Sequence, residues 1–119
     1  MSEGQKLTDL TFLRNFTGGQ ADKMTKYIRM FLTGAPQNIS QMELHALSKD
    51  WSGVYQSAHS LKPQLGYFGA KQSEELLKLI ERYSGDQMEV ERIPTMIEQF
   101  RKQYEIINSE LEIELKSIS

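Results

Sequence analysis

The sequence contains no cysteine, only three prolines and no long hydrophobic run. The absence of cysteine excludes disulfide bonds and thiolate metal sites, and it is typical of intracellular proteins. No segment approaches the roughly 18 consecutive apolar residues that a membrane-spanning helix requires. The opening residues, MSEGQKLTDL, also lack the apolar core of a signal peptide. We therefore expect a cytoplasmic protein that does not insert into membranes.

The chain also lacks an excess of positive charge. With 14 Lys and Arg against 16 Asp and Glu, its formal net charge is −2, so general affinity for nucleic acid is not expected. Hydrophobic residues make up 39% of the chain and charged residues 25%, as in ordinary globular proteins. A chain of 119 residues predicts one domain, residues 1–119, with a core that needs no disulfide or metal.

Helical periodicity runs along the chain, and no stretch alternates cleanly enough to predict a strand. Apolar residues recur every three or four positions in a short predicted helix at residues 8–16 and in longer ones over about 20–47, 51–68 and 87–117. Between the last two, a helix with Leu76, Leu77 and Ile80 is expected to end at residues 84–86. The connections are short, so consecutive helices should run antiparallel. The expected fold is all-α: an antiparallel four-helix bundle with a short N-terminal helix capping one end.

Capping residues and prolines refine the expected helices. Thr8 or Asp9 should cap the first helix, and Pro36 should kink the second. Asp50 is a good N-cap for the third helix, and Gly69 should end it. The inner face of the first helix is expected to consist of Leu10, Leu13 and Phe16.

The most informative segment is AHSLKPQLGYFGA, residues 58–70, in the third predicted helix. At 100° per residue, His59 lies about 140° from Val54, with Lys62 at about 80° and Gly66 at about 120°. His59 therefore falls outside the apolar stripe and should point to solvent, with a cation and a glycine on the same side. That stripe, at the spacing of a buried helix face, comprises Val54, Ala58, Leu61, Leu65 and Phe68.

This arrangement around His59 suits group transfer between proteins. A neutral imidazole is a good nucleophile near pH 7, because its unperturbed pKa is about 6.5. A nearby ammonium such as that of Lys62 stabilises an anion on the ring. Glycine on the same face lets the backbone of another protein approach closely. The pattern fits a histidine that carries a phosphoryl group.

The segment resembles the active-site helix of histidine-containing phosphotransfer (HPt) domains, which typically reads A-H-x-L-K-G-x-x-x-x-x-G-A. His59, Lys62 and the pair Gly69–Ala70 match this pattern, and the resemblance extends from about residue 9 to residue 81. It implies that His59 accepts a phosphoryl group from the phospho-aspartate of a receiver domain and passes it to another receiver, with Lys62 as electrostatic support. The partner-docking residues that we expect beside it are Tyr55, Pro63, Gly66 and Tyr67.

Pro63 departs from the family pattern, which usually has glycine directly after the lysine. Proline cannot donate a hydrogen bond to the His59 carbonyl, so the helix should bend or lose one bond there. Its ring also occupies a position that glycine leaves open to a partner. Pro63 therefore keeps an alternative open, in which the chain is a helical adaptor that binds a receiver or kinase without being phosphorylated. Retention of His59 and Lys62 argues against that alternative.

The resemblance implies receiver domains of response regulators or hybrid sensor kinases as partners. They should supply Mg²⁺, since this chain is expected to bind no cofactor and to act as a monomeric phosphocarrier without autonomous catalysis. A metal site is not expected, because neither His45 nor His59 has a carboxylate three or four positions away. His45, in the last turn of a helix, is expected to be structural. The pair Gly18–Gly19 is expected to be a capping turn rather than a phosphate loop.

Overall fold

The computed structural model describes residues 6–118, and all the regular structure within them is helical. The expectation about a signal peptide therefore lies partly outside the described residues. Between residues 6 and 118, no helix is both long enough and apolar enough to cross a membrane. The elements in chain order are α1 (Thr11–Thr17), α2 (Ala21–Leu47), α3 (Trp51–Tyr67), α4 (Lys71–Asp86), a 3₁₀ turn η1 (Val90–Arg92) and α5 (Ile93–Ile118).

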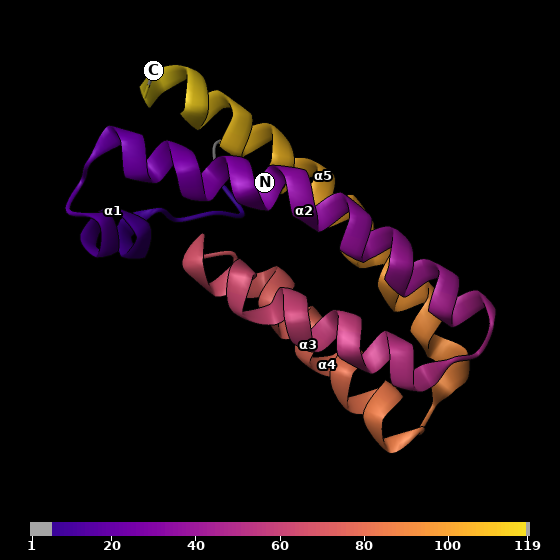
Figure 1. The fold of residues 1–119 in the computed structure, drawn as a ribbon. Coiled ribbons are helices and arrows are strands. Elements are labelled where there is room, and N and C mark those ends of the chain that lie inside the picture. The colour runs from indigo at the N-terminus through magenta and orange to yellow at the C-terminus, as the bar shows by residue number, and fades with distance from the viewer. Residues whose placement is uncertain (1–5, 119) are drawn as a thin grey trace.

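Four of these helices form an antiparallel bundle, as predicted. Figure 1 shows α2 and α5 running side by side in opposite directions, with the α3–α4 hairpin packed along part of their length. The helices α2 and α5 have 27 and 26 residues, whereas α3 and α4 have 17 and 16. Ten extra residues correspond to about 15 Å of helix. The short helix α1 lies at the end where the longer pair extends beyond the hairpin (Figure 1).

The predicted apolar stripe of α3 is confirmed. Its five residues are all at most 2% exposed, which places α3 with this face toward the core. Phe68, just past the end of α3, contacts Phe31 of α2 with ring centroids 4.8 Å apart, and Phe31 in turn meets Tyr104 of α5. Aromatic contacts of this kind add to the free energy of burial. They fix the end of α3 against the long helix pair.

The helix α1 differs from its prediction in phase and length. It begins at Thr11, where the Asp9 carboxylate accepts hydrogen bonds from both the amide and the hydroxyl of that residue. Leu10 and Leu13 are buried as expected, but Phe16 is 57% exposed, so its assignment to the inner face is wrong. The inner position one turn after Leu13 belongs to Thr17, whose hydroxyl donates to the Leu13 carbonyl at 2.8 Å.

The other helix ends agree with the sequence at α3 and differ at α5. Asp50 caps α3 by accepting a hydrogen bond from the Gly53 amide at 3.0 Å, and Gly69 follows the helix with a left-handed φ of +63°. The last helix was expected from about Gln87, but α5 begins at Ile93, after η1. Gln87 and Glu89 have φ values of +50° and +48°, which interrupt helical geometry between α4 and α5. The helices α2 and α3 each continue through their internal proline.

Candidate functional site

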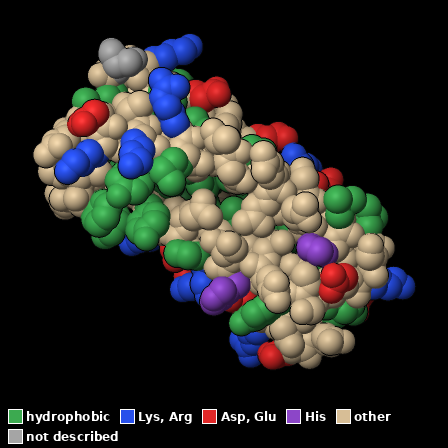
Figure 2. Space-filling view, in the orientation of Figure 1, with side chains coloured by type: hydrophobic (Ala, Val, Ile, Leu, Met, Phe, Trp, Pro, Cys, Tyr) green, Lys and Arg blue, Asp and Glu red, His purple; other side chains and the backbone are tan. Residues whose placement is uncertain are grey.

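His59 projects from the middle of α3 on the side opposite the core, as the helix phase predicted. Its side chain is 64% exposed, so one edge of the imidazole is open to solvent and to an approaching partner. Figure 2 shows both histidines of the chain on the face drawn, with a group of hydrophobic side chains nearer the α1 end of that face. The nucleophile proposed from the sequence is therefore accessible.

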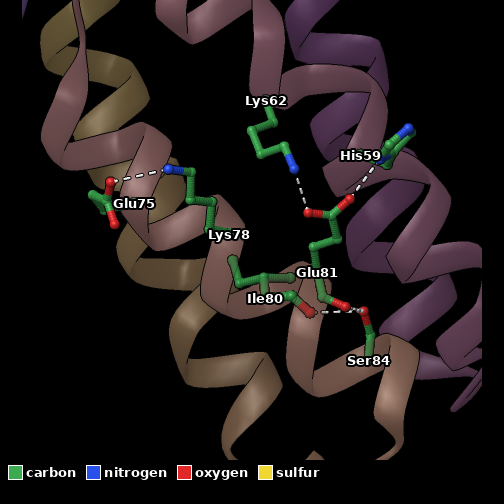
Figure 3. A network of polar contacts seen from close by, with 7 residues as sticks. All are labelled: His59, Lys62, Glu75, Lys78, Ile80, Glu81 and Ser84. Atoms are coloured by element: carbon green, nitrogen blue, oxygen red, sulfur yellow. Dashed lines mark hydrogen bonds and ion pairs between the residues drawn. The ribbon is translucent and has the colours of Figure 1, made fainter.

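Glu81 of α4 joins the two active-site candidates through its carboxylate. One oxygen, Oε2, lies 2.5 Å from Nδ1 of His59, and the other, Oε1, accepts a hydrogen bond from Nζ of Lys62 at 2.6 Å (Figure 3). Its side chain is only 13% exposed, while that of Lys62 is 26% exposed. A well-shielded carboxylate thus holds the histidine and the lysine one on each oxygen.

The contact with Glu81 assigns the protonation of the His59 ring. An ionised carboxylate only accepts hydrogen bonds, so Nδ1 must carry the hydrogen. In the neutral imidazole, Nε2 then has the free electron pair. Because Nδ1 faces the protein, the nitrogen left for chemistry is Nε2.

The ionisation of Glu81 supports this assignment. Burial raises the pKa of Glu81, but the hydrogen bonds from Lys62 and then from His59 lower it by more, so the pKa lies below its ordinary value. The carboxylate is therefore ionised near neutral pH. It can stabilise positive charge both on the lysine and on the ring.

Tyr55 completes the surroundings of the histidine. It lies one turn before His59 on α3, and the two rings stack with centroids 5.8 Å apart and planes 11° apart. The phenol ring lies beside the imidazole in an offset, nearly parallel arrangement, and Tyr55 remains 38% exposed. The structure thus brings Tyr55, His59 and Lys62 together, as expected from the sequence.

The remaining docking candidates lie farther along α3. Pro63 and Tyr67 are exposed, and Gly66 is partly exposed. Tyr67 belongs to an exposed aromatic cluster with Phe12 and Phe16 of α1, in which the ring centroids lie 5.9 to 6.4 Å apart. Tyr67 is eight residues from His59, or about 12 Å along the helix. An exposed group of large aromatic side chains is typical of a protein-binding surface.

Glu81 is the site residue that the sequence reasoning missed. It is 22 residues from His59 and reaches it only through the packing of α4 on α3. The available signal was its position on α4, directly after the buried Ile80 and one turn after the buried Leu77. A carboxylate at the border of an apolar stripe can meet polar side chains of the neighbouring helix, but the partner depends on the register between the helices.

His45 lies outside this site. Nδ1 of His45 lies 3.1 Å from an Asp50 oxygen in the turn between α2 and α3, away from Glu81. Among residues 6–118, no three His, Cys, Asp or Glu side chains are grouped so that they could hold a metal ion.

Comparisons with known proteins agree with this fold. The family model described as "Hpt domain" matches residues 26–110. The crystal structure of histidine-containing phosphotransfer protein B (HptB) from Pseudomonas aeruginosa PAO1 matches with a TM-score of 0.84 and 19% sequence identity, covering 92% of this chain and 95% of that one. At this identity the structural match concerns the fold. A search of curated proteins found no match to this chain.

Proposed function

The chain belongs to the Hpt domain family, whose model matches it from residue 26 to residue 110, and from that premise we propose that His59 carries its phosphoryl group. Members of this family are histidine phosphotransfer carriers of phosphorelays, and the chain is such a carrier. The observation that supports His59 is its geometry: Nδ1 is held by Glu81, and the side chain is 64% exposed. His45 is less exposed, at 34%, and contacts Asp50 instead.

The proposed reaction begins with the electron pair of Nε2. It attacks the phosphorus of a receiver's phospho-aspartate, the P–O bond to the aspartate breaks, and the aspartate leaves as a carboxylate. The ring then bears hydrogen on Nδ1 and phosphorus on Nε2, so it carries a positive charge. The Glu81 carboxylate, at 2.5 Å from Nδ1, stabilises that charge.

Onward transfer uses the same contacts in reverse. When the aspartate of a second receiver attacks the phosphorus, the P–N bond breaks and its electron pair returns to Nε2. The leaving group is then the neutral imidazole with hydrogen on Nδ1, which is the tautomer that Glu81 already holds. No proton has to move during either step. Lys62 lies one turn from His59. When its ammonium group moves away from Glu81, it provides positive charge near the phosphoryl group that is being transferred.

We propose that receiver domains of response regulators or hybrid sensor kinases dock over Tyr55, Pro63, Gly66 and Tyr67, with Phe12 and Phe16 extending this surface. A pocket of about 640 Å³ between α1 and the end of α3, lined in part by Phe12, Gly66 and Lys71, offers room for a partner side chain. The receiver would supply Mg²⁺, so the carrier needs no cofactor of its own and no autonomous catalysis. We also propose that the protein is a single domain that acts as a monomer in the cytoplasm.

The alternative of an adaptor that is never phosphorylated is not favoured. An adaptor needs neither an exposed imidazole nor a shielded carboxylate that selects its tautomer. Pro63 alone supported that alternative, and α3 continues through Pro63 to Tyr67. The family match also favours the carrier.

The decisive experiment compares two histidine variants in phosphotransfer. Receivers of the same organism, loaded with phosphate, are mixed with the wild type, His59→Gln or His45→Gln. The wild type and His45→Gln should take up an acid-labile, base-stable label, as a phosphoramidate does, while His59→Gln should take up none. Equal labelling of the two variants would reject His59 as the acceptor.

A further inference from the structure

The ring of Tyr55 lies next to both His59 on its own helix and Gly85 of α4. It stacks on His59 with planes 11° apart. A Cβ atom added to Gly85 would lie 2.9 Å from Cδ1 of Tyr55, closer than real Cβ contacts, and 3.2 Å from Cε1, which is tighter than most of them. The space that Gly85 leaves is therefore the space in which the Tyr55 ring sits.

The antiparallel helices α3 and α4 contact each other at two successive turns around His59. On α3, Tyr55 precedes His59 by one turn, and on α4, Gly85 follows Glu81 by one turn. Glu81 meets the edge of the imidazole, and Gly85 meets the Tyr55 ring that lies nearly parallel beside it. One contact sets which nitrogen points inward, and the other sets the plane of the ring. Together they restrict both side-chain torsions of His59.

The backbone of α4 gives no other reason for glycine at position 85. The glycines with positive φ in the described chain are Gly18, Gly19 and Gly69, so Gly85 does not need the freedom that only glycine has. The left-handed residue that ends α4 is Gln87. A helical position without such a need favours alanine over glycine. The three nearest atoms that a side chain at Gly85 would meet all belong to Tyr55.

We propose that Gly85 and Tyr55 are positioning residues for the phosphoryl transfer. Gly85 leaves the space that lets Tyr55 stack on His59, and the stacked ring keeps Nδ1 on Glu81 and Nε2 directed outward. This inference rests on the proposed function of His59. It gives Tyr55 a role inside the protein in addition to contact with a partner.

The test uses Gly85→Ala, Tyr55→Leu and Tyr55→Phe, with Gly34→Ala as a matched control, because a Cβ at Gly34 meets no atom within 4 Å. The first measurement is the ¹⁵N NMR spectrum of the unphosphorylated His59 ring, which reports its tautomer without any partner. The second is the rate of phosphorylation by phosphoramidate. In that reaction Nε2 forms a bond to phosphorus, the P–N bond of phosphoramidate breaks, and ammonia leaves with the electron pair.

Wild type and Gly34→Ala should show mainly the tautomer with hydrogen on Nδ1, and ³¹P NMR should show phosphorus on Nε2. Gly85→Ala and Tyr55→Leu should show mixed tautomers and react about two- to tenfold more slowly, the range expected for loss of one aromatic contact. Tyr55→Phe, which keeps the ring, should recover most of the rate lost in Tyr55→Leu. Adding Gly85→Ala to Tyr55→Leu should cause no further loss, because the ring that it displaces is already gone.

Wild-type tautomer and rate in folded Gly85→Ala would overturn the inference, and so would additive losses in the double variant. If Gly85→Ala fails to fold by circular dichroism, Tyr55→Leu decides alone, because it removes atoms and adds none. A wild-type tautomer and rate in that variant would mean that Tyr55 only packs. Phosphate on a residue other than His59, with the tautomer effects intact, would instead reject the proposed function and leave the positioning of the ring standing.

Discussion

The two histidines of this chain make the same contact and differ in almost everything around it. Each presents Nδ1 to a carboxylate, His59 to Glu81 at 2.5 Å and His45 to Asp50 at 3.1 Å. The side chain of His59 is 64% exposed and its carboxylate 13%, whereas His45 is 34% exposed and its carboxylate 48%. In one pair the ring faces solvent and the acid is shielded, and in the other the acid is the more exposed partner.

The surroundings of His45 explain this difference. A Cβ at Gly53 would lie 2.4 Å from its ring, so the imidazole lies flat against the start of α3. Asp50 also caps α3 through the Gly53 amide. The pair of His45 and Asp50 therefore closes the turn between two helices. A histidine–carboxylate contact does not mark a reactive histidine by itself. What distinguishes His59 is an open ring edge and a carboxylate shared with Lys62.

The strongest way to separate the two pairs is to remove each carboxylate. Glu81→Ala removes a charge-assisted hydrogen bond worth about 1.5 to 3 kcal/mol, so phosphotransfer to His59 should fall roughly 10- to 100-fold. Asp50→Ala should leave transfer unchanged and lower the free energy of unfolding by about 1 kcal/mol, because it removes an N-cap. Transfer assays and urea unfolding of both variants measure this. Equal transfer rates for the two would show that Glu81 does not act on the chemistry.

Removal of the cation sharpens the comparison further. Lys62→Ala should slow transfer by up to about fivefold, corresponding to about 1 kcal/mol, with an equally small change in stability. The control is Lys78→Ala, which removes a lysine of α4 that pairs with Glu75 (Figure 3). It should transfer at the wild-type rate. If Lys62→Ala unfolds the protein while its folded fraction transfers normally, then Lys62 is structural.

The contact of His45 with Gly53 can be tested by stability alone. Gly53→Ala should push the ring away from Asp50 and lower the free energy of unfolding by up to about 1 kcal/mol. Gly34→Ala, at an open helical position, should raise it by up to about 1 kcal/mol. Thermal or urea unfolding gives both values. A gain in Gly53→Ala equal to that in Gly34→Ala would mean that His45 does not pack on Gly53.

The smallest expected effect is the pH dependence of the Glu81 contact. The pKa of Glu81 is lowered in the folded protein, so its stabilisation is present above the unfolded value and is lost as pH falls through the folded pKa. Wild type should therefore exceed Glu81→Gln in stability by less than about 1 kcal/mol at pH 5 to 7. The difference should shrink as the pH falls below the unfolded value of about 4.3 and disappear once the pH is below the folded pKa. A difference that grows on acidification would contradict the direction of the pKa shift.

The fold could be predicted because its signals are local. The stripe from Val54 to Phe68 depends only on helix phase, and Asp50 and Gly69 are recognised within one turn of the helix ends that they cap. Phe16 shows where this reasoning fails. A helix of seven residues gives too few turns to fix its phase, and the real inner pair is Leu13 and Thr17. The start of α5 was missed because left-handed Gln87 and Glu89 carry no glycine signal.

The site could be predicted only as far as one helix carries it. His59 and Lys62 share α3, so their common side follows from spacing. Glu81 belongs to α4, and a shift of the helix register by one turn would exchange it for Leu77 or Gly85. The same reasoning explains why the space left by Gly85 could not be foreseen. Contacts between helices depend on packing that no local pattern in this chain specifies.

The distance between His59 and the aromatic cluster limits how far a docked partner can rotate. A partner that touched the protein only at His59 could turn about the axis of the forming N–P bond. On the docking surface that we propose, a second contact at Tyr67, Phe12 and Phe16, about 12 Å along α3, would restrict this rotation. A slip of about 1 Å at that end turns the partner by only about 5°. In-line geometry fixes the direction of the N–P bond and leaves rotation about it free, so the docking contacts that we propose at the far end of the helix would set that rotation.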